Sequence, residues 1–413
     1  SLGGTKAMIV TDEFLASNPM TTRIQAILKE ADSLDMDKAD HMIENVIGRF
    51  TLPMGVGINF VINGKDYVIP MVTEEPSVVA ACSNAAKMAR PGGGFTTDYT
   101  GSVMISQIQL LDVPAPFYAK GKILENKEKI AEICNARDPM LVKLGGGVKD
   151  VEVRVLDSLV GPMVVVHLLV DTGDAMGANA VNTMAEAVAP FLEELTGGRA
   201  ELRILSNLAD HRIARARAVF KKDAIGGEEV VDKMIAAYAF AAADPYRAAT
   251  NNKGIMNGII PVVIATGNDT RAIESGAHAY AARSGQYSPF ATWEKNADGD
   301  LVGSIEMPMA VGLVGGATKI HPAAKVAVKM LGVKTAGELA QIIAAVGLAQ
   351  NMAAMRALAT EGIQRGHMSL HARNLAATAG ATGELLEKIV KQMVSEKNVR
   401  LEYAQELVKQ YQK

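Results

Sequence analysis

The sequence predicts an α+β protein in which a βαββαβ module interrupts a larger, mainly helical unit and a small helical segment ends the chain. Residues 102–206 alternate between apolar strand patterns and helical patterns in the order βαββαβ. The sequence on both sides of them is rich in alanine helices and glycine turns, and from Gly366 onward it reads as short charged helices. These changes divide the chain into 1–101, 102–206, 207–364 and 365–413.

Composition excludes several classes of protein. The chain has 413 residues and a net charge of −3, so no overall attraction to nucleic acid or to an anionic membrane is expected. Aromatic residues make up only 5% of the chain, and the strands of the βαββαβ module lack the interleaved aromatic and basic residues of RNA-binding sheets. We therefore predict no nucleic-acid partner.

The cysteines and apolar runs point to a cytoplasmic protein. Cys82 and Cys134 are the two cysteines, and we expect both to be reduced thiols. With so few cysteines and scattered histidines, no metal site is predicted. No apolar run is judged long enough to cross a bilayer, and no signal peptide is recognised.

The first part of the chain contains a hairpin and a helix. Asn63-Gly64 separates strand patterns at 57–61 and 67–72, and both residues tolerate positive φ. Pro76-Ser77 then opens a helix that continues to Arg90. An earlier helix is expected over 21–31.

The inserted module and the rest of the large unit follow from their patterns. In the module we predict strands at 102–113, 151–156, 163–170 and 201–205, with helices at 116–137 and 179–196. Beyond it we predict helices at 230–243 and 336–360, a hairpin of 285–294 with 301–307, a strand-like run at 261–265, and C-terminal helices broken at Gly380 and Asn398.

The segment 171–179 is the first candidate for binding chemistry. It follows an apolar strand and opens a helix, and a helix N-terminus attracts phosphate. It equally fits a tight turn in which Asp174 or Asn179 caps the helix. No Gly-x-Gly-x-x-Gly turn follows a strand, so a dinucleotide would not be bound in the doubly wound manner.

Several charged residues could perform catalysis. Lys253, in a polar segment punctuated by glycine, could stabilise an oxyanion or could be an ordinary loop lysine. Asp269 follows the run 261–265 and could be an active-site carboxylate or a helix cap, and Glu75 is open to the same two interpretations. His367 and His371 lie four residues apart, where they could serve an acid–base role or belong to a basic surface helix.

Taken in order, these segments resemble a known family. The segments ENVIG, EEPS, DAMGAN, SNLAD, DPYRA, NKGIMNG, GND and RGHM stand at 44–48, 74–77, 174–179, 206–210, 244–248, 252–258, 267–269 and 365–368. This ordered set resembles class II 3-hydroxy-3-methylglutaryl-CoA reductases from about residue 40 onward.

The resemblance implies a function and an architecture. Members interconvert 3-hydroxy-3-methylglutaryl-CoA and mevalonate plus coenzyme A by two hydride transfers with a nicotinamide cofactor. It implies a large substrate domain, an inserted ferredoxin-like cofactor domain and a C-terminal flap. It also implies a homodimer or a dimer-based oligomer with active sites at the interface.

The resemblance also implies roles for single residues. Lys253 would hold the carbonyl oxygen, Glu75 would donate protons, Asp269 would lie between them, and His367 would protonate the departing thiolate. The matching substrate positions are Ser77, Arg247, Thr250, Asn257, Gln350 and His371. The matching cofactor positions are Asp138, Asp174, Met176, Gly177, Asn179 and Asn207.

The resemblance also bears on the choice of cofactor, because Asp138 matches an acidic residue near the adenosine ribose in members that prefer NADH. Its carboxylate would accept a hydrogen bond from a ribose 2′-hydroxyl and would repel a 2′-phosphate, although Arg137 beside it could soften that repulsion. NAD(H) is therefore favoured and NADP(H) stays possible. Two alternatives remain open, a related oxidoreductase for another CoA thioester and a catalytically inactive CoA-binding paralogue.

Overall fold

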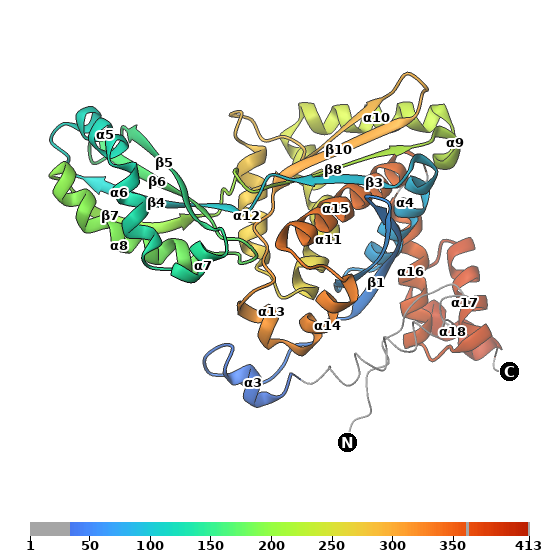
Figure 1. The fold of residues 1–413 in the computed structure, drawn as a ribbon. Helices are drawn as coiled ribbons and strands as arrows, with labels where there is room; N and C mark the ends of the chain where they lie inside the picture. Colours follow the sequence, from blue (N-terminus) through green and yellow to red (C-terminus); the bar gives the residue numbers. More distant parts are fainter. Residues whose placement is uncertain (1–33, 361–362, 412–413) are drawn as a thin grey trace.

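The computed structural model describes residues 34–360 and 363–411, with the backbone alone for 363–370. It shows a mixed α and β protein with two sheets and a separate C-terminal group of helices (Figure 1). The predicted helix over 21–31 lies outside the described residues. The α+β class predicted from the sequence is confirmed.

The large unit is built on a six-stranded sheet of order β2-β1-β3-β8-β10-β9. Its strands are β1 Met54–Ile62, β2 Lys65–Val72, β3 Phe95–Tyr99, β8 Ile213–Phe220, β9 Ala291–Lys295 and β10 Leu301–Pro308. The predicted hairpin is confirmed, since Ile62 pairs with Lys65 and the two turn residues Asn63 and Gly64 have φ of 49° and 76°. These twin positive φ values are what a two-residue hairpin turn requires.

Helix α15, Ala336–Ala359, is the core of this unit. It is apolar nearly all round and is packed by α4 Val78–Ala89, α11 Pro245–Ala265 and the sheet (Figure 1). Among the described residues it is the one helix long and apolar enough to span a membrane, which corrects the expectation that no such run exists. Its most apolar window is 67% buried inside the protein, as a core helix is.

The remaining elements of the large unit surround this core. They are α3 Met36–Asp40, the 3-10 turn Arg90–Gly92, α9 Lys222–Ile225, α10 Glu228–Ala243, α12 Thr270–Ala281, α13 Gly316–Ile320 and α14 Pro322–Leu331.

The small unit comprises β4 to β7 and confirms the predicted order βαββαβ. Its sheet has the order β5-β6-β4-β7, and its strands are β4 Val103–Leu111, β5 Gly147–Leu156, β6 Met163–Asp171 and β7 Arg199–Ser206. Its helices are α5 Pro116–Glu125, α6 Lys127–Asn135, α7 Pro139–Lys143 and α8 Ala178–Thr196. One face of the sheet buries residues such as Ile108 and Val166 against α8. The single helix expected over 116–137 is divided at Asn126, whose φ of −106° leaves the helical range.

The C-terminal segment forms its own small core. Helices α16 Ile363–Thr378, α17 Gly383–Ser395 and α18 Leu401–Tyr411 bury Ile389, Met393 and Leu407 between them. The predicted breaks at Gly380 and Asn398 both fall between helices, so this part of the prediction is confirmed.

The strand-like run 261–265 and the polar loop around Lys253 are instead parts of one helix, α11. Asp244 caps it by accepting a hydrogen bond from the Tyr246 amide at 3.1 Å, and Pro245 occupies the first turn. The prediction was wrong because a short apolar run has no period of its own, and because Pro261 and two glycines disguised the helix. The strand expected from 285 begins only at Ala291.

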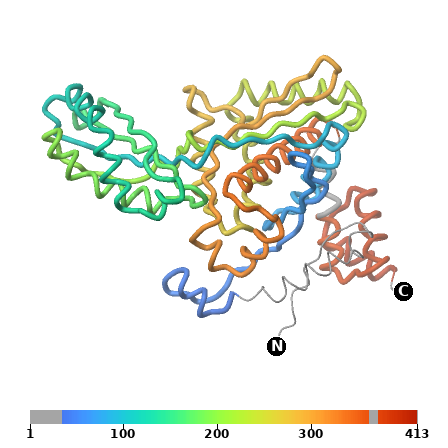
Figure 2. The backbone as a smooth tube through the Cα atoms, in the orientation of Figure 1, coloured from blue at the N-terminus to red at the C-terminus, as the bar shows by residue number. Residues whose placement is uncertain are grey.

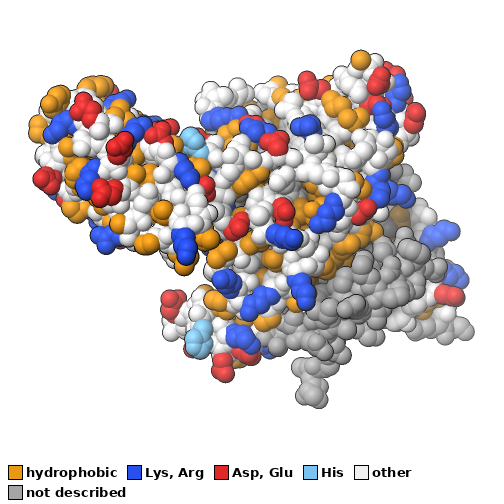
Figure 3. All heavy atoms as spheres, viewed as in Figure 1, with side chains coloured by type: hydrophobic (Ala, Val, Ile, Leu, Met, Phe, Trp, Pro, Cys, Tyr) orange, Lys and Arg blue, Asp and Glu red, His pale blue; other side chains and the backbone are white. Residues whose placement is uncertain are grey.

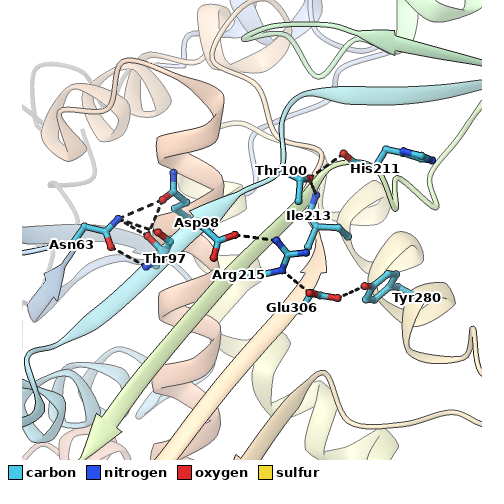
Figure 4. A network of polar contacts seen from close by, with 10 residues as sticks. Asn63, Thr97, Asp98, Thr100, His211, Ile213, Arg215, Tyr280 and Glu306 are labelled. Atoms are coloured by element: carbon cyan, nitrogen blue, oxygen red, sulfur yellow. Dashed lines mark hydrogen bonds and ion pairs between the residues drawn. The ribbon is translucent and has the colours of Figure 1, made fainter. Parts of the chain in front are cut away.

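Two chain crossings join the units and lie side by side (Figure 2). Thr100, on the outgoing crossing, donates its hydroxyl to the His211 carbonyl at 3.1 Å and accepts from the Ile213 amide at 2.9 Å (Figure 4). On the face drawn in Figure 3, acidic and basic side chains are interspersed over the small unit. These bonds hold the two crossings together where the units join.

Both thiols should be inert in the folded protein. Burial raises the pKa of Cys82 and the pKa of Cys134 to about 12 each, so almost no thiolate exists at pH 8. Titration with an aromatic disulfide reagent at pH 8 should find no fast-reacting thiol in native protein and two in denaturant. Rapid modification of native protein would contradict this burial.

Candidate active site

A lysine, a glutamate and an asparagine meet where α11 passes the end of β2. Lys253 Nζ lies 2.6 Å from Glu75 Oε2, and Asn257 Nδ2 donates to Glu75 Oε1 at 3.0 Å. Lys253 and Asn257 lie one turn apart on α11, so both reach the same carboxylate. The Lys253 side chain is 62% exposed and that of Glu75 33%, which leaves this cluster open to a ligand.

The same helix carries the other predicted substrate residues. Arg247 and Thr250 precede Lys253 at intervals of three residues, so each is the helix-surface neighbour of the next along α11. Arg247 is partly buried and Thr250 is exposed. A carboxylate and a carbonyl of one extended ligand could therefore be bound along a single helix.

The turn that carries Glu75 is held in a strained conformation. The Glu75 amide donates to Thr73 Oγ1 at 3.2 Å, and Ser77, the first residue before α4, has a φ of 73°. A non-glycine residue in the left-handed region costs of order 1–3 kcal/mol and is found mostly at functional sites. The turn thereby brings Ser77 to the same end of α4 as Glu75.

Buried amides fix the opposite side of α11, and sequence analysis missed them. Asn252 is fully buried and donates to the Tyr287 hydroxyl and the Ser288 carbonyl, both at 2.9 Å, while it accepts from the Phe290 amide at 3.0 Å. The Tyr287 hydroxyl also shares a hydrogen bond of 2.8 Å with His278 Nδ1, and burial raises the pKa of this hydroxyl. The only available sequence signal was a pair of asparagines beside the lysine.

A second chain of buried bonds joins α11 to α15. Asn251 accepts from Asn351 Nδ2 at 3.0 Å, and Asn351 Oδ1 accepts from the Trp293 indole at 2.7 Å. Together with Asn252, these bonds set the rotation of α11 about its axis. Because these bonds prevent α11 from rotating about its axis, the Lys253 side chain is held on the side of the helix that faces Glu75.

Asp269 stands at the N-cap of α12, and its implied place between Lys253 and Glu75 stays a prediction. Its Oδ1 caps α12 by accepting from the amides of Arg271 and Ala272 at 2.9 and 3.2 Å, and its Oδ2 pairs with the Arg271 side chain. The interpretation of Asp269 as a helix cap, which the sequence left open, is therefore confirmed. Asn268 beside it accepts from the Gly312 amide at 2.8 Å.

The loop 171–177 opens α8 without a side-chain cap. The residue at the N-cap position is Gly177, which has a φ of 96° and no side chain to accept a hydrogen bond from the helix amides. Both predicted caps are wrong, because Asn179 lies inside the first turn and the Asp174 carboxylate accepts from the Ala336 amide at 2.8 Å. The free amides at this N-terminus suit a phosphate group.

The small unit places the other cofactor candidates at its edges. Asp138 caps α7 through a bond from the Leu141 amide to Oδ1 at 2.9 Å. Asn207 is exposed just beyond β7, and Met176 is partly buried in the loop before α8.

The remaining candidates are dispersed. Gln350 is 6% exposed in α15, where its Oε1 lacks a hydrogen-bond partner. His371 is exposed on α16. The His367 side chain lies outside the described side chains, although its backbone belongs to α16. No group of three or more potential metal ligands occurs within the described part of the chain.

Comparison with known proteins decides the family. A family model described as hydroxymethylglutaryl-coenzyme A reductase matches residues 9–372. This chain belongs to that family. The chain is 63% identical over 385 residues to the 3-hydroxy-3-methylglutaryl-coenzyme A reductase of Archaeoglobus fulgidus, covering 93% of this chain and 88% of that protein. It is 39% identical to a probable reductase of Borreliella burgdorferi, covering 81% of this chain and 77% of that protein.

Solved structures confirm the class II type. The class II reductase of Streptococcus pneumoniae, described as bound to NADPH in open conformations, superposes with a TM-score of 0.80 at 42% identity, covering 95% of this chain and 96% of that one. Another structure of the Streptococcus pneumoniae enzyme gives a TM-score of 0.82 at 40% identity, covering 97% of this chain and all of that one. The class II resemblance seen in the sequence is therefore confirmed.

Gly177 tolerates no side chain. In Gly177→Ala, the new Cβ would lie 2.3 Å from Thr172 Cγ2 at a φ of 96°, so the free energy of unfolding in urea should fall by roughly 1–3 kcal/mol. Gly173→Ala is the matched control, because its Cβ would meet open space and only the φ of 57° is unfavourable. Equal losses in the two variants would show that the close approach at Gly177 has no consequence.

Proposed function

We propose that this chain reduces 3-hydroxy-3-methylglutaryl-CoA to mevalonate and coenzyme A, and that the Glu75–Lys253–Asn257 cluster is the reacting site. The thioester takes up two hydrides and two protons, the C–S bond breaks, and a primary alcohol and a thiol leave. The single observation that carries the proposal is this cluster at the matching positions of a chain that belongs to the reductase family.

Lys253 and Glu75 have different roles at the substrate carbonyl. The Lys253 ammonium stabilises the negative charge that develops on the carbonyl oxygen, first of the thioester and then of the aldehyde stage. Glu75, 2.6 Å from that ammonium, protonates the first reduced oxygen, takes that proton back when the C–S bond breaks, and protonates the alcohol oxygen after the second hydride, so that with the proton on the thiol the net uptake is two. Asn257 keeps the carboxyl oriented by its bond to Oε1.

The acyl group is recognised along α11. Arg247 offers a guanidinium fork to the free carboxylate of the substrate, with Thr250 and Ser77 as hydroxyl partners. Two alternatives are kept as outcomes of the test below, a related enzyme for another CoA thioester and an inactive CoA-binding paralogue. The positively charged guanidinium of Arg247 favours an acyl group that carries a free carboxylate in addition to the thioester.

The nicotinamide cofactor supplies the hydrides when bound, and the residues at the α8 end of the small unit would hold it. Its phosphates suit the uncapped helix N-terminus at Gly177, beside Asp174, Met176 and Asn179, with Asn207 at the boundary toward the substrate. We propose NADH as the preferred form because the Asp138 carboxylate has Oδ2 free for a 2′-hydroxyl while Oδ1 caps α7. The Streptococcus pneumoniae structure is described with NADPH, so both forms belong in the test.

The C-terminal helices would complete the site. His367 on α16 is proposed to protonate the departing thiolate, whose ordinary pKa near 8.5 makes an imidazolium a competent donor at neutral pH. His371, four residues on, and Gln350 are proposed to contact the coenzyme A part. Such a helical flap would exclude water once closed.

The domain division and the assembly are proposals as well. Separate apolar cores support a large substrate domain of 1–101 and 207–364, a cofactor domain of 102–206 and a flap of 365–413. A homodimer is supported by the exposed apolar side chains of Ile43, Ile47 and Phe50, which are 65%, 101% and 93% exposed. A cytoplasmic location remains a prediction of the sequence.

Lys253→Ala should abolish turnover while the protein stays folded. Loss of one charge at the developing oxyanion should lower kcat by at least about 10²–10³-fold, measured as NADH oxidation with 3-hydroxy-3-methylglutaryl-CoA. The matched control is Lys233→Ala, which removes a lysine of similar exposure from α10. Unchanged turnover in Lys253→Ala would refute the mechanism, and a folded wild type that oxidises no cofactor would favour one of the two alternatives.

Asp138→Asn should change the cofactor preference. Asparagine can still cap α7, but without a charge it no longer repels a 2′-phosphate, so the ratio of kcat/KM for NADPH over NADH should rise about tenfold. Steady-state kinetics with both cofactors measures this ratio. A wild type that prefers NADPH, or a ratio that Asp138→Asn leaves unchanged, would contradict the role of Asp138.

A further inference from the structure

A fully buried arginine lies at the junction of the two units. Arg212 is 0% exposed and stands at the end of the returning crossing, directly before β8. Its guanidinium donates to five acceptors, and every one of them is neutral. They are the Tyr99 hydroxyl, Thr172 Oγ1, and the carbonyls of Ala175, Met176 and Val311.

These acceptors come from both sides of the junction. Three of them, Thr172, Ala175 and Met176, belong to the loop before α8, at 3.1–3.2 Å from Nη1. Tyr99 and Val311 belong to the large unit and bond Nε and Nη2. A buried charge is costly unless its donors are all bonded, so the loop cannot leave Arg212 without exposing an unsatisfied cation.

The loop is also seated directly on the large unit. The Leu313 amide donates to the Asp174 carbonyl at 2.8 Å, and a Cβ on Gly312 would lie 2.5 Å from the Met176 nitrogen. Gly312 in turn donates to Asn268, the neighbour of Asp269. Bonds therefore run without a gap from Arg212 through the loop to the segment that begins α12.

We propose that Arg212 is a positioning residue that clamps the 172–176 loop of the small unit onto the large unit, and so fixes a nicotinamide cofactor held at the α8 N-terminus relative to Lys253 and Glu75. This inference rests on the proposed function for its consequence in catalysis. The clamp itself is a property of the protein without ligands. Hydride transfer is sensitive to distance, so a loosened loop lowers the rate of transfer more than the binding of the thioester.

Hydrogen–deuterium exchange of the full chain tests the clamp without substrate or cofactor. Arg212→Lys keeps the charge but loses the fork, so amides of 172–177 should exchange about tenfold faster while the strands of the small sheet stay protected. The matched control is Arg215→Lys, three residues further along, whose side chain is 42% exposed and pairs with Asp98 and Glu306 (Figure 4). Equal exchange in the two variants would overturn the proposal.

Kinetics separates the clamp from the proposed function. In Arg212→Lys, kcat should fall about tenfold and the deuterium isotope effect on the transferred hydrogen should increase, whereas KM for the thioester should not change. A fall in kcat that Arg215→Lys shares would count against the proposal. If the wild type itself oxidises no cofactor, the proposed function fails and the exchange contrast alone decides the clamp.

Two milder variants keep the test valid if Arg212→Lys fails to fold. Thr172→Val and Tyr99→Phe each remove one acceptor of Arg212 on opposite sides of the junction. Each should speed exchange of 172–177 by a smaller factor than Arg212→Lys would. Wild-type exchange in both variants would contradict the clamp.

Discussion

The orientation of α11 is the constraint on which the site depends. One side of this helix presents Lys253 and Asn257 to Glu75, and the other side holds Asn251 and Asn252 in fully bonded, buried positions. Leaving a buried amide unsatisfied costs about 1–3 kcal/mol for each group, so a rotation of the helix is strongly disfavoured. The exposed ion pair between Lys253 and Glu75 contributes little by itself, since such pairs are worth about 0–1 kcal/mol. The amides position the lysine, and the lysine remains available to a substrate.

The same logic recurs at the junction of the two units. Arg212 satisfies its charge with neutral oxygens from both of them, which fixes the uncapped N-terminus of α8 against the large unit. The Asp174 side chain adds a second tie by accepting from the first residue of α15. The core helix, the loop before α8 and the segment before α12 therefore behave as one connected framework. A cofactor and a thioester bound on different units would come into contact because this framework fixes the position of one unit relative to the other.

The sequence alone predicted much of the fold. The βαββαβ order, the hairpin at Asn63-Gly64 and the C-terminal breaks follow from local patterns, which need no knowledge of distant contacts. Helix α11 was not recognised, because Pro261 and the glycines at 254 and 258 suit the close packing of a buried helix but are read locally as turns. Gly258 is needed there, since a Cβ would lie 2.7 Å from Gln350. The direct Lys253–Glu75 contact joins residues 178 positions apart. The sequence indicated both as candidates from their residue types, but it could not show that they are in contact. Arg212 carried no motif and Asn252 was only the first residue of the segment 252–258, so the structural role of each appears only when their buried hydrogen bonds are traced.

The stoichiometry of the reaction tests the central claim most directly. Purified protein would be mixed with a limiting amount of 3-hydroxy-3-methylglutaryl-CoA and excess reduced cofactor, and both cofactor oxidation and free thiol would be measured to completion. Two equivalents of cofactor oxidised for each thiol released are predicted, because the thioester must pass through the aldehyde stage to the alcohol. One equivalent for each thiol, or thiol release without oxidation, would contradict the account.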